Sequence, residues 1–140
     1  MIGHFEIRCL ACAHTVHARQ AARCVACGGT LGFSYARPRR WPASAGRLWD
    51  YAELLPIAPD IEPVSLGEGG TPMIAAARMP GARVFWKNEA ANPTGSQKDR
   101  ALSVAITHAK AIAASRIAVA STGSVGLACA AYSPSPASAG

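Results

Sequence analysis

The sequence predicts an α/β protein preceded by a small cysteine-rich segment, and three observations support this prediction. Two Cys-x-x-Cys pairs lie within the first 27 residues. An apolar stripe at helical spacing follows a turn near residue 95. Further along, a short apolar run at 116–120 continues through small residues into a second helical segment at 125–132. A strand that leads into a helix in this way is the repeating unit of α/β folds.

Length and composition limit the possible architectures. The chain has 140 residues, enough for one ordinary domain and a small module. Half of the residues are hydrophobic, only 6% are aromatic, and 30 are alanine, so the core must be aliphatic and largely helical. The sequence contains no run of eighteen apolar residues, and its start lacks the apolar region of a secretory signal. We therefore expect a cytoplasmic protein with no membrane partner.

The net charge of +6 is concentrated at one end of the chain. Residues 1–47 carry seven arginines and one glutamate, whereas residues 48–140 carry seven basic and seven acidic side chains. A basic segment can bind nucleic acid. However, four thiolates around one Zn²⁺ would add a charge of −2, and basic surface is usually just solvated. We therefore expect no nucleic-acid partner.

Four of the five cysteines have the spacing of a metal site. Each Cys-x-x-Cys turn can direct two sulfurs at one ion, and two such turns complete a tetrahedron. Gly28 and Gly29 follow the second pair and give the chain freedom to reverse direction. We expect a structural zinc ribbon over 1–35 whose ligands are Cys9, Cys12, Cys24 and Cys27.

Other interpretations of these cysteines remain open. They could form two disulfides, which need an oxidising compartment, or they could simply be buried in the core. His4, His14 and His17 could each replace a thiolate, although four cysteines already close a structural site.

The remaining chain divides by composition. Residues 36–47 combine Pro, Gly, Ser and charged residues without any period and predict a linker, and 48–132 form the second module. Within it, 48–55 has helical spacing and 82–88 has strand character. The glycine-rich segment 65–72 predicts a turn whose backbone closely approaches a ligand or another loop. Residues 133–140 have the composition of a linker-like tail.

A lysine lies where a turn becomes a helix. Asn92-Pro-Thr-Gly95 is a turn sequence, Ser96 is the expected N-cap, and Lys98 then falls in the first helical turn. The helix dipole and Arg100 favour the neutral amine that attacks aldehydes, whereas Asp99 opposes this effect. By position alone, an ordinary solvated lysine is the favoured interpretation. The expected core-facing stripe of this helix is Leu102, Ala105, Ile106, Ala109, Ile112 and Ala113.

Four segments in this order and spacing resemble threonine synthases: Ser65–Pro72, Lys87–Glu89, Asn92–Arg100 and Ala120–Gly126. Several members of that family also begin with a four-cysteine ribbon and a Leu-Trp-x-Tyr segment. The resemblance implies a pyridoxal-phosphate-dependent enzyme of the tryptophan-synthase β-like fold, which has a parallel sheet with helices. The chain would hold only the N-terminal part of that fold, incomplete at its C-terminus.

The resemblance also implies roles for particular residues. Lys98 would be the catalytic residue that holds pyridoxal phosphate through its amine and then moves protons on the substrate. Ser124 stands where the family has an asparagine that contacts the cofactor. Gln97 stands where an aromatic residue is common. Ser121, Thr122 and Gly123 would receive the substrate carboxylate, because a strand–loop–helix junction offers free amides to an anion.

The activity that the resemblance implies is conversion of O-phosphohomoserine and water to threonine and phosphate. The substrate would therefore be a phosphorylated amino acid. A cysteate synthase, another lyase of this family, and a non-catalytic zinc-ribbon interaction protein are the alternatives. We expect the chain alone to be truncated and inactive, with exposed apolar edges. These edges would be covered in a homo-oligomer or by a missing C-terminal portion.

Overall fold

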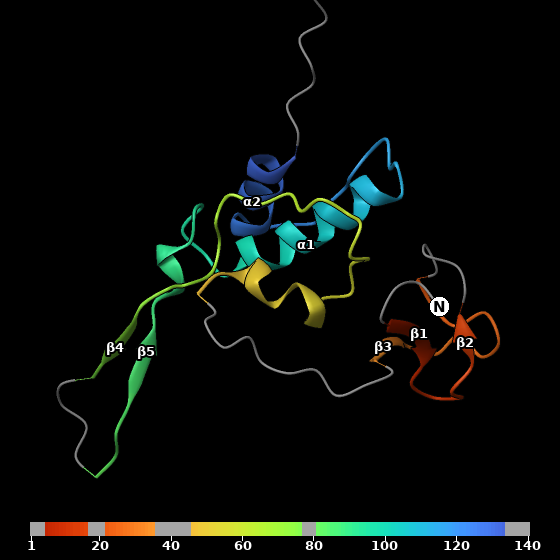
Figure 1. Cartoon of the computed structure of the whole chain (residues 1–140), viewed down its shortest axis with the longest axis horizontal. Coiled ribbons are helices and arrows are strands. Elements are labelled where there is room, and N and C mark those ends of the chain that lie inside the picture. Colours follow the sequence, from red (N-terminus) through yellow and green to blue (C-terminus); the bar gives the residue numbers. More distant parts are fainter. Residues whose placement is uncertain (1–4, 17–21, 36–45, 77–80, 134–140) are drawn as a thin grey trace, which may run out of the picture. The chain divides into compact units, whose positions relative to one another are not determined.

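The computed structural model describes residues 5–16, 22–35, 46–76 and 81–133 (Figure 1). These residues fall into two compact units, one within Met1–Trp41 and Ala52–Ile61, the other within Pro42–Tyr51 and Glu62–Gly140. Most of the expected linker and nearly all of the expected tail lie outside the described residues, so the four segment limits stay a prediction. None of the described helices is long and apolar enough to cross a bilayer.

The first unit contains a small antiparallel sheet with strand order β2-β1-β3. Its strands are β1 (Phe5–Cys9), β2 (Thr15–Val16) and β3 (Leu31–Tyr35). Phe5 lies opposite Tyr35 in the register of β1 and β3 and meets the Phe33 ring edge-on, with centroids 5.6 Å apart. Few apolar side chains are buried here, so this sheet needs another source of stability.

The second unit is built on two helices that pack together, α1 (Lys98–Ala111) and α2 (Ser124–Tyr132) (Figure 1). Their shared core contains Leu102, Ile106, Ala128, Cys129 and Tyr132. Cys129 is thus a small core residue. The unit also contains the hairpin of β4 (Met73–Ala75) and β5 (Phe85–Lys87) and the short 3₁₀ helix η2 (Glu89–Ala91).

The helix expected over 48–55 is a 3₁₀ helix, η1 (Leu48–Leu54), with a non-helical residue at Tyr51. Its start is fixed by Asp50, whose carboxylate accepts the amides of Gly46 and Arg47 at 2.7 Å each. Pro56 follows soon after. The few residues between this cap and the proline favour the tighter helix.

Helix α1 begins at Lys98, but two details of the expectation are wrong. Gln97 occupies the N-cap position, while the Ser96 hydroxyl accepts the amide of Lys98 at 3.1 Å. The buried face is also rotated, because Ala105 is exposed whereas Ser103 and Thr107 are buried.

The rotation of α1 has a clear cause in the segment that crosses it. The Ser103 hydroxyl donates to the carbonyl of Val64 at 2.7 Å, and the amide of Val64 donates to the Thr107 hydroxyl at 2.9 Å. The hydroxyls of Ser103 and Thr107 therefore pair with both the carbonyl and the amide of Val64. Burying unpaired backbone groups is costly, so this pairing outweighs the preference for alanine on the buried face.

The expected parallel sheet is not found, because every strand pairing among the described residues is antiparallel. The segment 116–120, expected as a buried strand, is irregular and exposed. A strand needs a hydrogen-bonded neighbour, and no described strand lies beside this segment. The strand expected over 82–88 is shorter, at Phe85–Lys87. Apolar surface is exposed, as expected, at Met73, Ile74, Phe85, Trp86, Ile117, Val119 and Leu127.

The glycine-rich turn at 65–72 closely approaches another loop, one of the two expected possibilities. Gly69 has a φ of +93°, and a Cβ at this position would lie 2.6 Å from the amide nitrogen of Leu48. The amide of Leu48 donates to the carbonyl of Glu68 at 3.0 Å. Only glycine fits a backbone contact this close at a positive φ.

Candidate functional site

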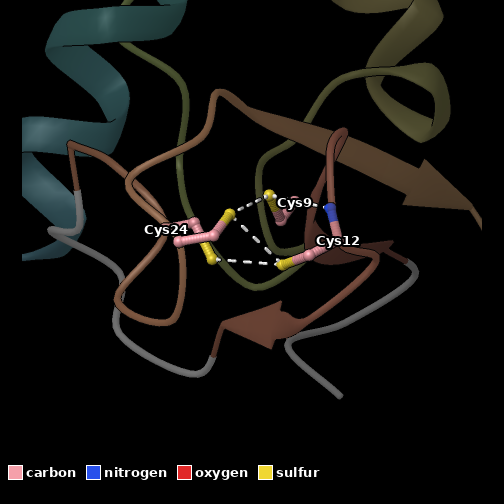
Figure 2. A group of neighbouring side chains, drawn as sticks. Cys9, Cys12 and Cys24 are labelled. Carbon is pink, nitrogen blue, oxygen red and sulfur yellow. Dashed lines mark hydrogen bonds between the residues drawn. The ribbon is translucent and has the colours of Figure 1, made fainter.

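The four cysteines of the two pairs form one cluster in the first unit. Their sulfurs all lie within 4.8 Å of one another (Figure 2). The separation is 3.5 Å for Cys9 and Cys27, 3.7 Å for Cys12 and Cys24, and 3.4 Å for Cys12 and Cys27. All are free thiols. Four sulfurs about 2.3 Å from a tetrahedral Zn²⁺ would be about 3.8 Å apart, so the cluster fits this ion.

The two halves of the cluster repeat the same local turn. The carbonyl of Cys9 accepts the amide of Ala13 at 3.0 Å, and the carbonyl of Cys24 accepts the amide of Gly28 at 2.8 Å. Ala13 and Gly28, each the residue after the second cysteine of its pair, have φ values of 59° and 72°. Each turn thus ends in a left-handed residue, a conformation that glycine adopts without strain and alanine does not.

Backbone amides favour the thiolate form of two of the cysteines. The amides of Cys12 and Ala11 lie 3.5 and 3.4 Å from the Cys9 sulfur, and they lower the pKa of this thiol to about 6. The amide of Gly29 favours the thiolate of Cys27, but hydrogen bonds with Cys12 and Cys9 and burial together raise the pKa of Cys27 to about 12. Amide donors are typical of sites that hold thiolates.

Of the three histidines near the cysteines, the structure describes only His14, which is not part of the cluster. His14 is exposed, and its backbone carbonyl accepts the amide of Cys9 at 2.9 Å. His4 and His17 lie outside the described residues.

The second candidate site surrounds Lys98, the first residue of α1. This side chain is half-buried, and within 5–16, 22–35, 46–76 and 81–133 no group forms a hydrogen bond or an ion pair with its amine. The chain has two other lysines. Lys87 donates its amine to the carbonyl of Thr71, and Lys110 is exposed in the last turn of α1. Lys98 thus combines partial burial with an amine that no described group engages.

The side chain that follows Lys98 is fixed by the preceding turn. Asp99 is fully buried, and its carboxylate accepts the amide of Thr94 at 3.1 Å and the Thr94 hydroxyl at 2.8 Å. These two bonds close the turn that carries the lysine.

A charged network holds the next residue, Arg100. Its guanidinium donates to both carboxylate oxygens of Glu89, at 2.7 and 2.9 Å, and to the Thr71 hydroxyl at 3.1 Å. The Arg100 guanidinium, followed by smaller contributions from Thr71 and Asn92, lowers the pKa of Glu89 to about 2. Asn92 also accepts the amide of Gly69 at 3.0 Å. The network thus joins three of the four segments that carry the resemblance.

A buried acid that was not singled out from the sequence, Glu68, lies in the same unit. It is fully buried, and its carboxylate accepts the indole N–H of Trp49 at 2.8 Å, the amide of Leu66 at 3.0 Å and the hydroxyl of Tyr132 at 2.9 Å. Burial favours its neutral form, but hydrogen bonds from Ser103 and the other donors outweigh burial and lower the pKa of Glu68. The signal for Glu68 in the sequence was an acidic residue between two glycines, Gly67 and Gly69.

The loop before α2 makes none of the hydrogen bonds just described for Asp99, Arg100 and Glu68. Ser121, Thr122, Gly123 and Ser124 are all exposed. The Ser121 hydroxyl accepts the amides of Gly123 and Gly126 at 2.9 Å each, so this side chain shapes the loop. No hydrogen bond or ion pair within the described residues joins the loop to Lys98. The roles expected for its residues therefore stay predictions.

Comparison with known proteins identifies the family. A family model described as pyridoxal-phosphate dependent enzyme matches residues 64–134, about half of the chain. The chain belongs to this family of pyridoxal-phosphate-dependent enzymes. The matched region contains the lysine turn, the charged network and the loop before α2.

Curated relatives of the chain include several threonine synthases. It is 34% identical to the threonine synthase of Methanocaldococcus jannaschii over 138 residues, which cover 90% of this chain and 34% of that protein. It is 43% identical to that of Mycobacterium leprae over 95 residues, 66% of this chain and 26% of that protein. The chain thus spans about a quarter to a third of their length. No solved structure matches it significantly.

Proposed function

We propose that this chain is the lysine-bearing part of a threonine-synthase-like lyase. The reaction would convert O-phosphohomoserine and water to threonine and phosphate. In that reaction the bond between Cγ and the phosphate oxygen breaks, and phosphate leaves with the electron pair. Water supplies the hydroxyl at Cβ, and protons are moved between the carbon atoms. Support comes from the family membership and from relatives that are named threonine synthase.

The single observation that carries the proposal is the state of the Lys98 amine. It lies at the start of a helix and is engaged by no described group, whereas the side chains of its two successors are held by two hydrogen bonds at Asp99 and three at Arg100. An amine in this position can bind an aldehyde cofactor and then accept or return a proton at the substrate. Pyridoxal phosphate, when bound, supplies an electron sink for the substrate carbon atoms.

The loop before α2 would contribute to the proposed substrate site. The positive end of the α2 dipole suits a carboxylate, and the resemblance implies the same role for this loop, so we assign Ser121, Thr122 and Gly123 to substrate binding. Ser124 would contact the cofactor. A hydroxyl is shorter than an asparagine amide and donates only one hydrogen bond, so this contact would be weaker than in relatives with asparagine.

The test uses the three lysines of the full chain as mutual controls. The chain is incubated with pyridoxal phosphate, reduced with borohydride and digested, and the modified lysines are quantified by mass spectrometry. We expect Lys98 to be labelled preferentially over Lys110, and Lys98→Ala to remove this label only. Equal labelling of Lys87, Lys98 and Lys110 would show that this chain has no cofactor site.

For the cysteine cluster we propose a structural zinc ion, bound by Cys9, Cys12, Cys24 and Cys27. Support comes from the donor set and from sulfur separations close to those of a zinc tetrahedron. All four positions around the ion would be filled, so the metal would stabilise the fold and take no part in the reaction. Reduced cysteines that share a metal suit the cytoplasm, where we place the protein.

A further inference from the structure

Lys98 is contained in a turn that one buried carboxylate closes. Both oxygens of Asp99 accept hydrogen bonds from Thr94, one from its amide at 3.1 Å and one from its hydroxyl at 2.8 Å. Because Thr94 precedes α1 and Asp99 is the second residue of the helix, the two bonds form a ring. The backbone of Lys98 is part of this ring.

Asp99 also interacts electrostatically with a residue of the helical core, Tyr132. Asp99 is fully buried, and its charge contributes, after burial and Glu68, to the raised pKa of Tyr132. The Tyr132 hydroxyl in turn donates to Glu68 at 2.9 Å. Asp99 is thus fixed through its two bonds with Thr94 and through its complete burial. Successive helical residues point about 100° apart, so a fixed Asp99 directs Lys98 toward the half-exposed side of the helix.

We propose that Asp99 is a positioning residue for Lys98, and that its ring with Thr94 holds the amine in the orientation that binds an aldehyde. The inference rests on the proposed function of Lys98. Asp99 does not touch the reacting atoms, and its effect passes through the backbone of the turn. A misplacement of about 1 Å can lower a reaction rate about a hundredfold, so loosening the ring should slow the reaction of Lys98 selectively.

A matched pair of substitutions separates positioning from stability. Thr94→Val removes the hydroxyl that donates to Asp99 and keeps the shape and the amide of the residue. Thr107→Val makes the same chemical change at a buried hydroxyl further along α1, where Thr107 bonds to Val64 and Ser103. Both variants lose hydrogen bonds, but only the first loosens the lysine turn.

The measurement is the ratio of pyridoxal-phosphate labelling at Lys98 to that at Lys110 in the full chain, after borohydride reduction. Circular dichroism first establishes that each variant is folded at the temperature used. We expect Thr94→Val to lower the ratio about tenfold and Asp99→Asn to lower it further. Thr94→Ser, which keeps the hydroxyl, should retain the wild-type ratio, as should Thr107→Val.

The two proposals fail in different ways. If the wild-type chain labels Lys98 and Lys110 equally, the proposed function of Lys98 is wrong, and the positioning role falls with it. If the wild type prefers Lys98 and folded Thr94→Val and Asp99→Asn keep that preference, only the positioning role is wrong. An equal loss of preference in Thr107→Val would overturn it too, because general destabilisation would then be the cause.

Discussion

The hydroxyl of Tyr132, the last residue of α2, donates to the carboxylate of Glu68 at 2.9 Å across 64 residues of sequence. Both side chains are almost completely buried. The same carboxylate accepts the indole N–H of Trp49, so one acid joins the glycine-rich turn to η1 and α2. A buried charge persists only where hydrogen bonds compensate for its lost hydration, and Glu68 has several.

Removing one of these donors should be costly. We predict that Tyr132→Phe lowers the free energy of unfolding by about 1.5–3 kcal/mol, because a buried carboxylate loses a hydrogen bond. The control is Tyr35→Phe, which removes a hydroxyl that donates to the neutral carbonyl of Leu54 at 2.7 Å and should cost about 0.5–1.5 kcal/mol. Urea unfolding followed by circular dichroism measures both. Equal costs would contradict a special role for Glu68.

The ion pair of Glu89 and Arg100 predicts acid sensitivity. The pKa of Glu89 is about 2 in the folded chain, below its ordinary value of 4.5. Its stabilisation is therefore present above about pH 5 and is lost as the pH falls toward 2. Because the pair is partly exposed, we expect a contribution of about 1–2 kcal/mol.

The pH dependence of stability distinguishes the Glu89–Arg100 ion pair from an acid that has no such partner. Glu89→Gln should be less stable than the wild type at pH 7, and the two should converge as the pH approaches 2. Chemical unfolding at a series of pH values measures the difference. Glu62→Gln, at an exposed carboxylate, should follow the wild-type profile. A Glu89→Gln deficit that stays constant with pH would argue against the ion pair.

The two cysteine turns predict substitutions of opposite sign. Gly28→Ala places a side chain at a φ of +72° with no atom nearby to clash, so only backbone strain of about 1–2 kcal/mol is expected. Ala13→Gly relieves the corresponding strain at a φ of +59°, and should stabilise the metal-loaded protein by up to about 1 kcal/mol. Thermal unfolding with excess zinc compares them. A change of the same sign in both variants would show that the turns are not equivalent.

Metal removal should affect the first unit much more than the second. We predict one zinc ion per chain, and chelation should disorder the small sheet while the helical circular dichroism of α1 and α2 remains. A zinc content near zero, with all thiols reactive in the native protein, would disprove the site.

A single methyl group should weaken the metal site. A Cβ on Gly29 would lie 3.0 Å from the Cys9 sulfur and 3.2 Å from that of Cys27, so Gly29→Ala should push two ligands apart. We expect at least about a tenfold loss of zinc affinity, equivalent to about 1.4 kcal/mol. Competition with a chelator of known affinity measures this. Gly126→Ala in α2 is the control and should leave the affinity unchanged.

Local sequence patterns were sufficient to predict those features of the two sites whose residues are close together in the chain. The two Cys-x-x-Cys pairs predict a cluster because each turn alone directs two sulfurs to one side. The position of Lys98 at a helix start follows equally from the turn residues before it. The prediction of a strand at 116–120 was wrong because an apolar run forms a strand only where a partner strand lies beside it.

The sequence by itself determined which four cysteines cluster, that Lys98 lies at a helix start, and the family, because each depends on residue types at short spacing. Only the tertiary structure decided that Glu68 and Asp99 are buried, that Ser103 and Thr107 face inward in place of Ala105, and that the sheets are antiparallel. These features depend on partners between 5 and 64 residues away, whose hydrogen bonds offset the cost of burying a polar group. No local pattern encodes such a partner, so folding must bring it into place.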